Sequence, residues 1–341
     1  MTAIAPSKRR TFVRNLPVIR SLRQSVGLQR GMLITGLVIT GIFVLTAIFA
    51  PLIAPYGFAQ LQGPHGNFGA QDPPSPAHLL GTTVGGYDVL SRVIWGAQTA
   101  LLAIIVAVVL SFFIGILVGV VSGYLGGWLD RVLVVIADAV YAFPTLLLAI
   151  VAAIVISGGS SNLIGGVLAS GLSITAVYIP QYFRVVRAEA VRIKSEAFVE
   201  SAKVIGTSTI RIMFRHVLRN ATRSLPLIFT LNASDAIFTL AALGFLGFGI
   251  EPNSAAEWGY DLNKSISDVT SGIWWTSIFP GMAIVLVIVG ITLVGESLND
   301  LADPRLRTRR RAAGVTTLGT VSVQGGGALD DDVIAIDELE G

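Results

Sequence analysis

The chain has 341 residues, of which 53% are hydrophobic and 13% charged, and its mean hydropathy is +0.73. A soluble domain carries about 25% charged residues, so this composition excludes a disordered chain and argues strongly against a water-soluble enzyme. The net charge is only +3. Cysteine is absent, which excludes a disulfide framework, a thiolate metal site and a cysteine nucleophile. The sequence therefore predicts an integral membrane protein.

Long windows without Asp, Glu, Lys or Arg locate the membrane spans, because a transmembrane helix needs about 20 apolar residues to cross about 30 Å of hydrocarbon. The longest of these windows, 139–183, holds parts of two helices, since the turn-forming run 157–162 separates two apolar stretches. The apolar runs lack the alternation of a barrel strand, so the predicted fold is all-α. The six expected spans are Met32–Ile53, Ala97–Val121, Leu133–Ile156, Leu163–Phe183, Leu225–Phe248 and Trp274–Val294.

The basic residues predict the orientation of these spans. Of the 24 Lys and Arg residues, 22 lie before the first span, between the second and third, between the fourth and fifth, or after the sixth. By the positive-inside rule both termini and the segment 184–223 are then cytoplasmic. The first apolar stretch is too long for the core of a cleavable signal peptide, so we expect it to be an anchor.

Two terminal segments flank the predicted membrane domain of residues 32–304. Residues 1–31 are basic and carry apolar residues at helical spacing, which predicts either a basic helix on the inner leaflet or a solvated tail. Residues 305–341 begin with arginines and end with acidic residues. That composition cannot bury a core, so we expect a disordered cytoplasmic tail.

The sequence contains no recognisable catalytic or cofactor motif. Its three histidines are scattered, and no lysine follows a glycine as a phosphate-binding P-loop requires. We therefore expect no cofactor, metal or catalytic residue in this chain. If the protein uses ATP, the hydrolysing site lies on another polypeptide.

The segment 184–223 carries the most informative pattern. Apolar residues recur at helical spacing from Ala197 to Ile205, Gly206 interrupts them, and a second apolar run extends from Ile210 to Leu218. A helix, a glycine turn and a second helix would form a compact knob that docks into a partner's groove. The alternative is an amphipathic hairpin that rests on the bilayer.

This segment resembles the EAA loop of the permeases of bacterial ABC importers, on Glu200-Ser201-Ala202, Gly206 and Arg215-His216-Val217-Leu218. The runs 78–83, 88–92, 123–127, 245–249, 258–259 and 300–305 resemble the oligopeptide and dipeptide permease "C" subunits, so the likeness covers roughly residues 30–308. The chain departs from the pattern at Arg219, where relatives have proline, and at Thr83 and Leu240, where many have an acid. The change at Leu240 falls at a position of the fifth span that could face the pathway.

The resemblance implies a type I importer in a bacterial inner membrane. Its partners would be a second permease, two ATPase subunits (or one fused ATPase) that hold ATP and Mg, and an extracytoplasmic binding protein, with no nucleic acid involved. The solute would be a dipeptide or oligopeptide, with nickel and haem as alternatives. The implied ATPase-coupling residues are Glu200, Ser201, Ala202, Gly206, Arg215 and His216.

Asp138 and Asp235 fall within predicted spans, where an acidic residue is costly and points to function. Asp138 lies near the inner end of its span, which favours a structural ion pair over a pathway role. Asp235 lies deeper and could serve either the pathway or helix packing. A proton-coupled secondary transporter would use both as proton sites, but such carriers usually have more spans and internal repeats. An intramembrane enzyme is disfavoured because no catalytic constellation is present.

Three further patterns concern packing and the outer surface. Gly115, Gly119 and Gly123, at a spacing of four, predict the close approach of another helix. We expect a group of aromatic residues to anchor the interface, and four acids to form a solvated outer loop. The aromatics are Tyr56, Phe58, Trp258, Tyr260, Trp274 and Trp275, and the acids are Glu251, Glu257, Asp261 and Asp268.

Overall fold

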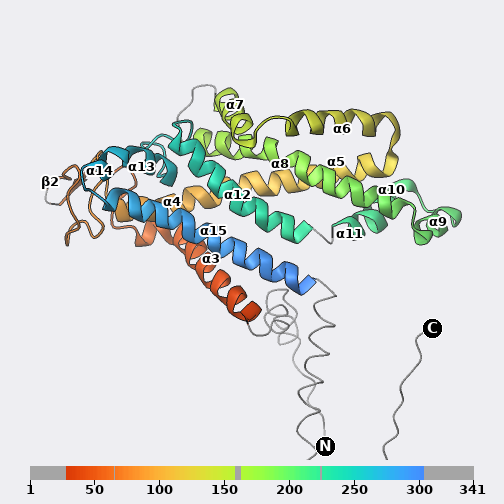
Figure 1. Ribbon diagram of the computed structural model, residues 1–341, viewed down its shortest axis with the longest axis horizontal. Helices are drawn as coiled ribbons and strands as arrows, with labels where there is room; N and C mark the ends of the chain where they lie inside the picture. The colour runs from red at the N-terminus through yellow and green to blue at the C-terminus, as the bar shows by residue number, and fades with distance from the viewer. Residues whose placement is uncertain (1–27, 65, 158–162, 223–224, 303–341) are drawn as a thin grey trace, which may run out of the picture. The chain divides into compact units, whose positions relative to one another are not determined.

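The computed structural model describes residues 28–64, 66–157, 163–222 and 225–302 (Figure 1). The predicted amphipathic stretch near the N-terminus and the predicted tail 305–341 lie outside this part of the chain. This part of the chain is mostly helical, as expected. One short hairpin pairs β1 (Gln62–Gly63) with antiparallel β2 (Gly66–Asn67).

The long helices account for most of the predicted spans. They are α3 (Leu28–Ile53), the continuous run of α4 (Val89–Ile104), the π-helical η1 (Ile105–Val109) and α5 (Leu110–Leu125), then α8 (Leu163–Lys194), α12 (Leu225–Phe245) and α15 (Trp275–Ala302). Within the described ranges, four helices are long and apolar enough to cross a membrane, or five if a bent pair counts as one span. The protein is thus a multi-pass membrane protein. The predicted span Leu163–Phe183 lies within α8, which is not one of those four.

The predicted third span, Leu133–Ile156, is not one helix. It is divided between α6 (Gly127–Tyr141) and α7 (Thr145–Ser157), whose axes differ by 99°. Pro144 explains the break, since the residue before a proline avoids the α-helical region and proline cannot donate the next backbone hydrogen bond. The apolar stretch predicted as the third span is therefore a bent pair of helices, which hydropathy alone does not reveal.

The glycine stripe of α5 packs against α8, as its spacing predicted, and the two helices run side by side in Figure 1. A Cβ atom at Gly119 would lie 2.9 Å from the carbonyl oxygen of Phe183, and one at Gly123 would lie 2.7 Å from that of Arg187. Any larger residue would push the helices apart, so these positions bring the two backbones into contact.

At one end of the long helices, the loop 54–88 and the segment 246–274 fold together with α13 (Trp258–Lys264) and α14 (Ile266–Thr270). We call this part the cap. Its central contact is a buried ion pair in which Nε of Arg92 donates to both carboxylate oxygens of Asp261, at 2.7 and 2.8 Å. Nη1 of Arg92 also donates to the carbonyl oxygen of Phe58 at 3.1 Å, so one guanidinium joins three segments.

The cap corrects the prediction of a solvated acidic loop, because Glu257, Asp261 and Asp268 are all buried. Both carboxylate oxygens of Glu257 accept backbone N–H groups, from Gly259 at 2.8 Å and Tyr260 at 2.7 Å, and so begin α13. Burial raises the pKa of Glu257 to about 8, although the two backbone donors act in the opposite direction.

Trp258 is also buried, and its indole N–H donates to the carbonyl oxygen of Val93 at 3.1 Å. It is a core residue of the cap, so the prediction that it anchors the membrane interface was wrong.

Candidate functional site

The segment 184–223 folds as predicted into a helix, a glycine turn and a second helical stretch. The first helix is α9 (Ala197–Val204), and the second stretch consists of α10 (Thr209–Arg211), the π-helical η2 (Ile212–Val217) and α11 (Leu218–Ala221). Gly206 has φ +78°, a left-handed conformation that suits glycine and ends α9. Ala202 and Lys203 accept the N–H groups of Thr207 and Gly206, each at 3.0 Å. We call this unit the knob.

The inner face of the knob is apolar and buried. Val199 and Ala202 of α9 are buried with Ile212, Met213 and Val217 of η2, and η2 in turn contacts α5 and α8. This packing fixes the knob to the long helices, so a force applied to the knob would reach the spans as a rigid-body movement.

The outer end of the knob exposes apolar side chains on both sides of the glycine turn. Val204 is 87% exposed, Ile205 is 80% exposed and Ile210 is 69% exposed. Single exposed apolar residues are common, but three around one turn form a surface suited to another protein. We call Val204, Ile205 and Ile210 the knob tip.

The structure brings the six predicted coupling residues together in the knob, but they serve different positions. Glu200, Ser201 and Arg215 are exposed, and His216 is half-buried with its ring 6.4 Å from that of Phe198. Ala202 is buried and contributes to packing, and Gly206 forms the turn. The helical stretch continues past Arg219 and ends at Ala221.

The knob tip was not among the contact residues predicted from the sequence. Apolar residues that flank a glycine turn in a predicted solvent-facing loop would have been the signal.

A cavity of about 170 Å³ lies at the bend between α6 and α7, and α8 and α12 close it. We call it the bend cavity. Asp235 lines it, and the Tyr178 hydroxyl donates to Oδ2 of this carboxylate at 2.7 Å. The other residues that line it are Val140, Tyr141, Phe143, Thr145, Leu148, Val177 and Gln181.

Asp138 lies apart from the residues that line the bend cavity. Its carboxylate is 3.4 Å from Nη2 of Arg184, and both side chains are about half exposed, at 54% and 53%. The guanidinium of Arg184 also lies 4.9 Å from the ring centroid of Tyr141. This pairing is the structural role that the sequence favoured for Asp138.

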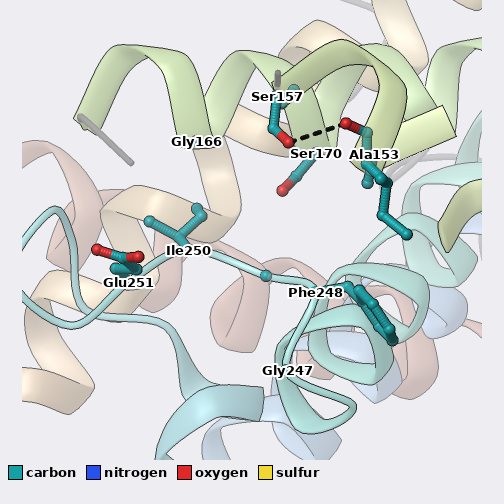
Figure 2. A pocket seen from close by; sticks show the side chains of 11 residues that line it. Ala153, Ser157, Gly166, Ser170, Gly247, Phe248, Ile250 and Glu251 are labelled. Carbon is teal, nitrogen blue, oxygen red and sulfur yellow. Dashed lines mark hydrogen bonds between the residues drawn. The ribbon is translucent and has the colours of Figure 1, made fainter. Parts of the chain in front are cut away.

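A second cavity, of about 200 Å³, lies near the ends of α7 and α12. We call it the end cavity. Figure 2 shows Ser157 and Ser170 on its helical side and Phe248, Ile250 and Glu251 on the loop that faces them. Glu251 is exposed.

Both cavities are lined by α7, by α8 and by α12 or the loop that follows it. The bend cavity touches the first turn of α7 and the middle of α12, and the end cavity touches the last turns of α7 and the loop that follows α12. Along α8, Ser170 and Gln181 are separated by about 16 Å at 1.5 Å per residue. We call this line of cavities the seam.

The described residues include no group of three His, Asp or Glu side chains placed to hold a metal ion. In this part of the chain, the geometry therefore offers two features for function: the knob, with its apolar tip, and the seam.

Two family descriptions match the chain. "Binding-protein-dependent transport system inner membrane component" matches residues 115–308, which include the knob and the seam, and "N-terminal TM domain of oligopeptide transport permease C" matches residues 29–74. The chain belongs to this family of importer permeases. The resemblance seen in the sequence is thus confirmed.

Named relatives agree with the family. The glutathione transport system permease protein GsiD of Shigella flexneri is 36% identical over 276 residues, which cover 81% of this chain and 87% of the relative. GsiD of Escherichia coli O157:H7 is 35% identical over the same coverage. The dipeptide transport system permease protein DppC of Alkalihalophilus pseudofirmus is 34% identical over 281 residues, 81% of this chain and 86% of the relative.

Proposed function

We propose that this chain is the permease subunit of an ATP-driven importer of dipeptides or oligopeptides in a bacterial inner membrane. It spans the membrane six times, with α8 as the fourth span, and both termini are cytoplasmic. The distribution of the basic residues supports this topology. The names of the relatives, which refer to glutathione and dipeptides, favour a small peptide over nickel or haem.

The chain works in a complex. A second permease completes the pathway, an extracytoplasmic binding protein delivers the solute, and two ATPase subunits or one fused ATPase bind the knob and hold ATP and Mg. The knob carries this proposal, because it joins an exposed apolar tip to a buried face, and its element η2 contacts α5 and α8. Glu200, Ser201, Arg215 and His216 border that contact, and the Gly206 turn presents the tip.

The proposal is tested by purifying the tagged chain in mild detergent and identifying the proteins that accompany it. The wild-type chain should bring a second permease and a P-loop ATPase. Ile205→Asp should lose the ATPase and keep the permease, because a carboxylate at the tip would be desolvated in the groove of the ATPase.

Ile266→Asp is the matched control. It places the same charge at an exposed isoleucine of α14 in the cap, away from the knob, so recovery of the ATPase should equal that of the wild type. Equal recovery of the ATPase with Ile205→Asp and with wild type would refute the assignment of the knob.

A further inference from the structure

The seam contains a carboxylate that pairs with no basic side chain in the part of the chain that the structure describes. Asp235 lies at the middle of α12, eleventh of 21 residues, and is exposed toward the bend cavity. Among the described residues its bonded partner is the neutral Tyr178 hydroxyl, and the nearby basic residues Arg184 and Arg187 pair with Asp138 and Asp130 instead.

An acidic side chain in a membrane span is costly and is normally paired or faces a water-filled cavity. The hydrogen bond from Tyr178 is neutral and does not compensate the charge of Asp235, which lines the cavity. The surroundings offer neutral polar groups from Gln181 and Thr145 and an aromatic ring from Phe143, while the ring of Tyr141 already lies against the guanidinium of Arg184.

The end cavity repeats this arrangement at the other end of the seam. It also contains one carboxylate, that of Glu251, and among the described residues neither cavity is lined by lysine, arginine or histidine. Each cavity therefore presents one carboxylate to a solute, and Arg184, which lies against the Tyr141 ring beside the bend cavity, is paired with Asp138.

We propose that Asp235, held by Tyr178, binds the protonated amino group of the solute midway through the membrane. The inference rests on the proposed function and deepens it, because it names the chemical group of the peptide that the permease recognises. Dipeptides and glutathione both carry a free amino group that is protonated at neutral pH. Asp235 thus determines specificity, and Tyr178 positions its carboxylate.

The test uses the purified complex in liposomes with ATP inside and its binding protein outside. Uptake of alanyl-alanine is compared with uptake of the N-acetylated dipeptide, at concentrations that give equal occupancy of the binding protein. The wild type should prefer the free amine. Asp235→Asn keeps an oxygen for the Tyr178 hydroxyl but removes the charge, and should lower kcat for alanyl-alanine about 10- to 100-fold with little change in KM.

The other variants separate charge from structure. Asp235→Glu should retain most of the uptake, and Tyr178→Phe should reduce it less than Asp235→Asn. Leu231→Ala, on the same exposed face of α12, should affect the two peptides equally.

Three results have distinct meanings. If the wild type takes up both peptides equally at equal occupancy, the inference is wrong while the proposed function stands. If Asp235→Asn lowers both uptakes equally and also reduces recovery of the second permease, Asp235 pairs with a basic residue of that partner and the inference is again wrong. If the wild type takes up neither peptide with ATP, the proposed function itself fails.

Discussion

Replacing Arg92 by methionine removes the guanidinium that joins α4 to both segments of the cap. The ion pair with Asp261 is almost fully buried, with side-chain exposures of 2% and 8%. The guanidinium also lies 5.0 Å from the ring centroid of Tyr87. Arg92→Met keeps the aliphatic part of the side chain and leaves the Asp261 carboxylate buried without its partner.

Removing one partner of a buried ion pair costs about 3–5 kcal/mol, because the remaining charge is not compensated. At about 1.4 kcal/mol per factor of ten, the open form of the cap should become more populated by a factor of about 100 to 4,000. The double variant Arg92→Met/Asp261→Leu should recover most of this loss, since it removes both charges together.

The absence of cysteine makes a simple assay available. Ser265 is a buried residue of the cap, one turn beyond Asp261, and Ser265→Cys is nearly isosteric. The rate of maleimide labelling of this single thiol in detergent reports how often the cap opens. Arg92→Met should raise the labelling rate by the factor given above, and the double variant should return it toward wild type.

Arg192→Met is the matched control, because Arg192 is 62% exposed and its pairs with Glu189 and Glu196 lie on the surface. Exposed ion pairs contribute about 0–1 kcal/mol, so labelling should hardly change. Additive effects of Arg92→Met and Asp261→Leu in the double variant would refute the reasoning, since they would show that the two residues do not stabilise the cap as a pair.

Three further predictions concern the packing of α5, the pH dependence of the cap and the knob. Gly119→Ala should destabilise the protein by about 1–3 kcal/mol, because its Cβ atom meets the carbonyl oxygen of Phe183. Gly41→Ala, in open space on α3, should stabilise the protein slightly. Equal unfolding temperatures of the two variants in detergent would contradict this prediction. Glu257 has its pKa raised from 4.5 to about 8, so only the folded state holds the proton between these values. The contribution of Glu257 to stability is then full below pH 4.5 and falls by about 1.4 kcal/mol per pH unit up to pH 8. Unfolding of Glu257→Gln measured at pH 5.5 and 7.5 should lack this fall, and an unchanged pH dependence would show that another group causes it. Gly206→Val should reduce solute-stimulated ATP hydrolysis by the complex, and Gly206→Asn should retain most of it. Asparagine tolerates the left-handed conformation of this turn, whereas a β-branched residue does not. Equal ATP hydrolysis by the two variants would show that the turn conformation is not needed for coupling.

Features set by local spacing could be predicted from the sequence. Gly115, Gly119 and Gly123 share one helix face whatever the rest of the fold does, so their contact with another helix followed from their spacing. The knob followed in the same way, because Gly206 separates two apolar runs that each have helical spacing.

Features set by distant partners could not be predicted in this way. Asp261 is buried because Arg92, 169 residues earlier, reaches it, and Asp235 meets Tyr178 across 57 residues. A window of hydropathy contains no information on such pairs. The 99° bend was missed for another reason, since Pro144 scarcely changes the mean hydropathy of its window but prevents a continuous helix.

The most direct test of the proposed function is uptake of a labelled dipeptide by liposomes that contain the complex purified through this chain. Uptake should require ATP inside the liposomes and the binding protein outside, and a proton gradient alone should drive none. Uptake driven by a proton gradient, without ATP and without any ATPase in the preparation, would contradict the account. It would instead identify a secondary transporter with Asp138 and Asp235 as its proton sites.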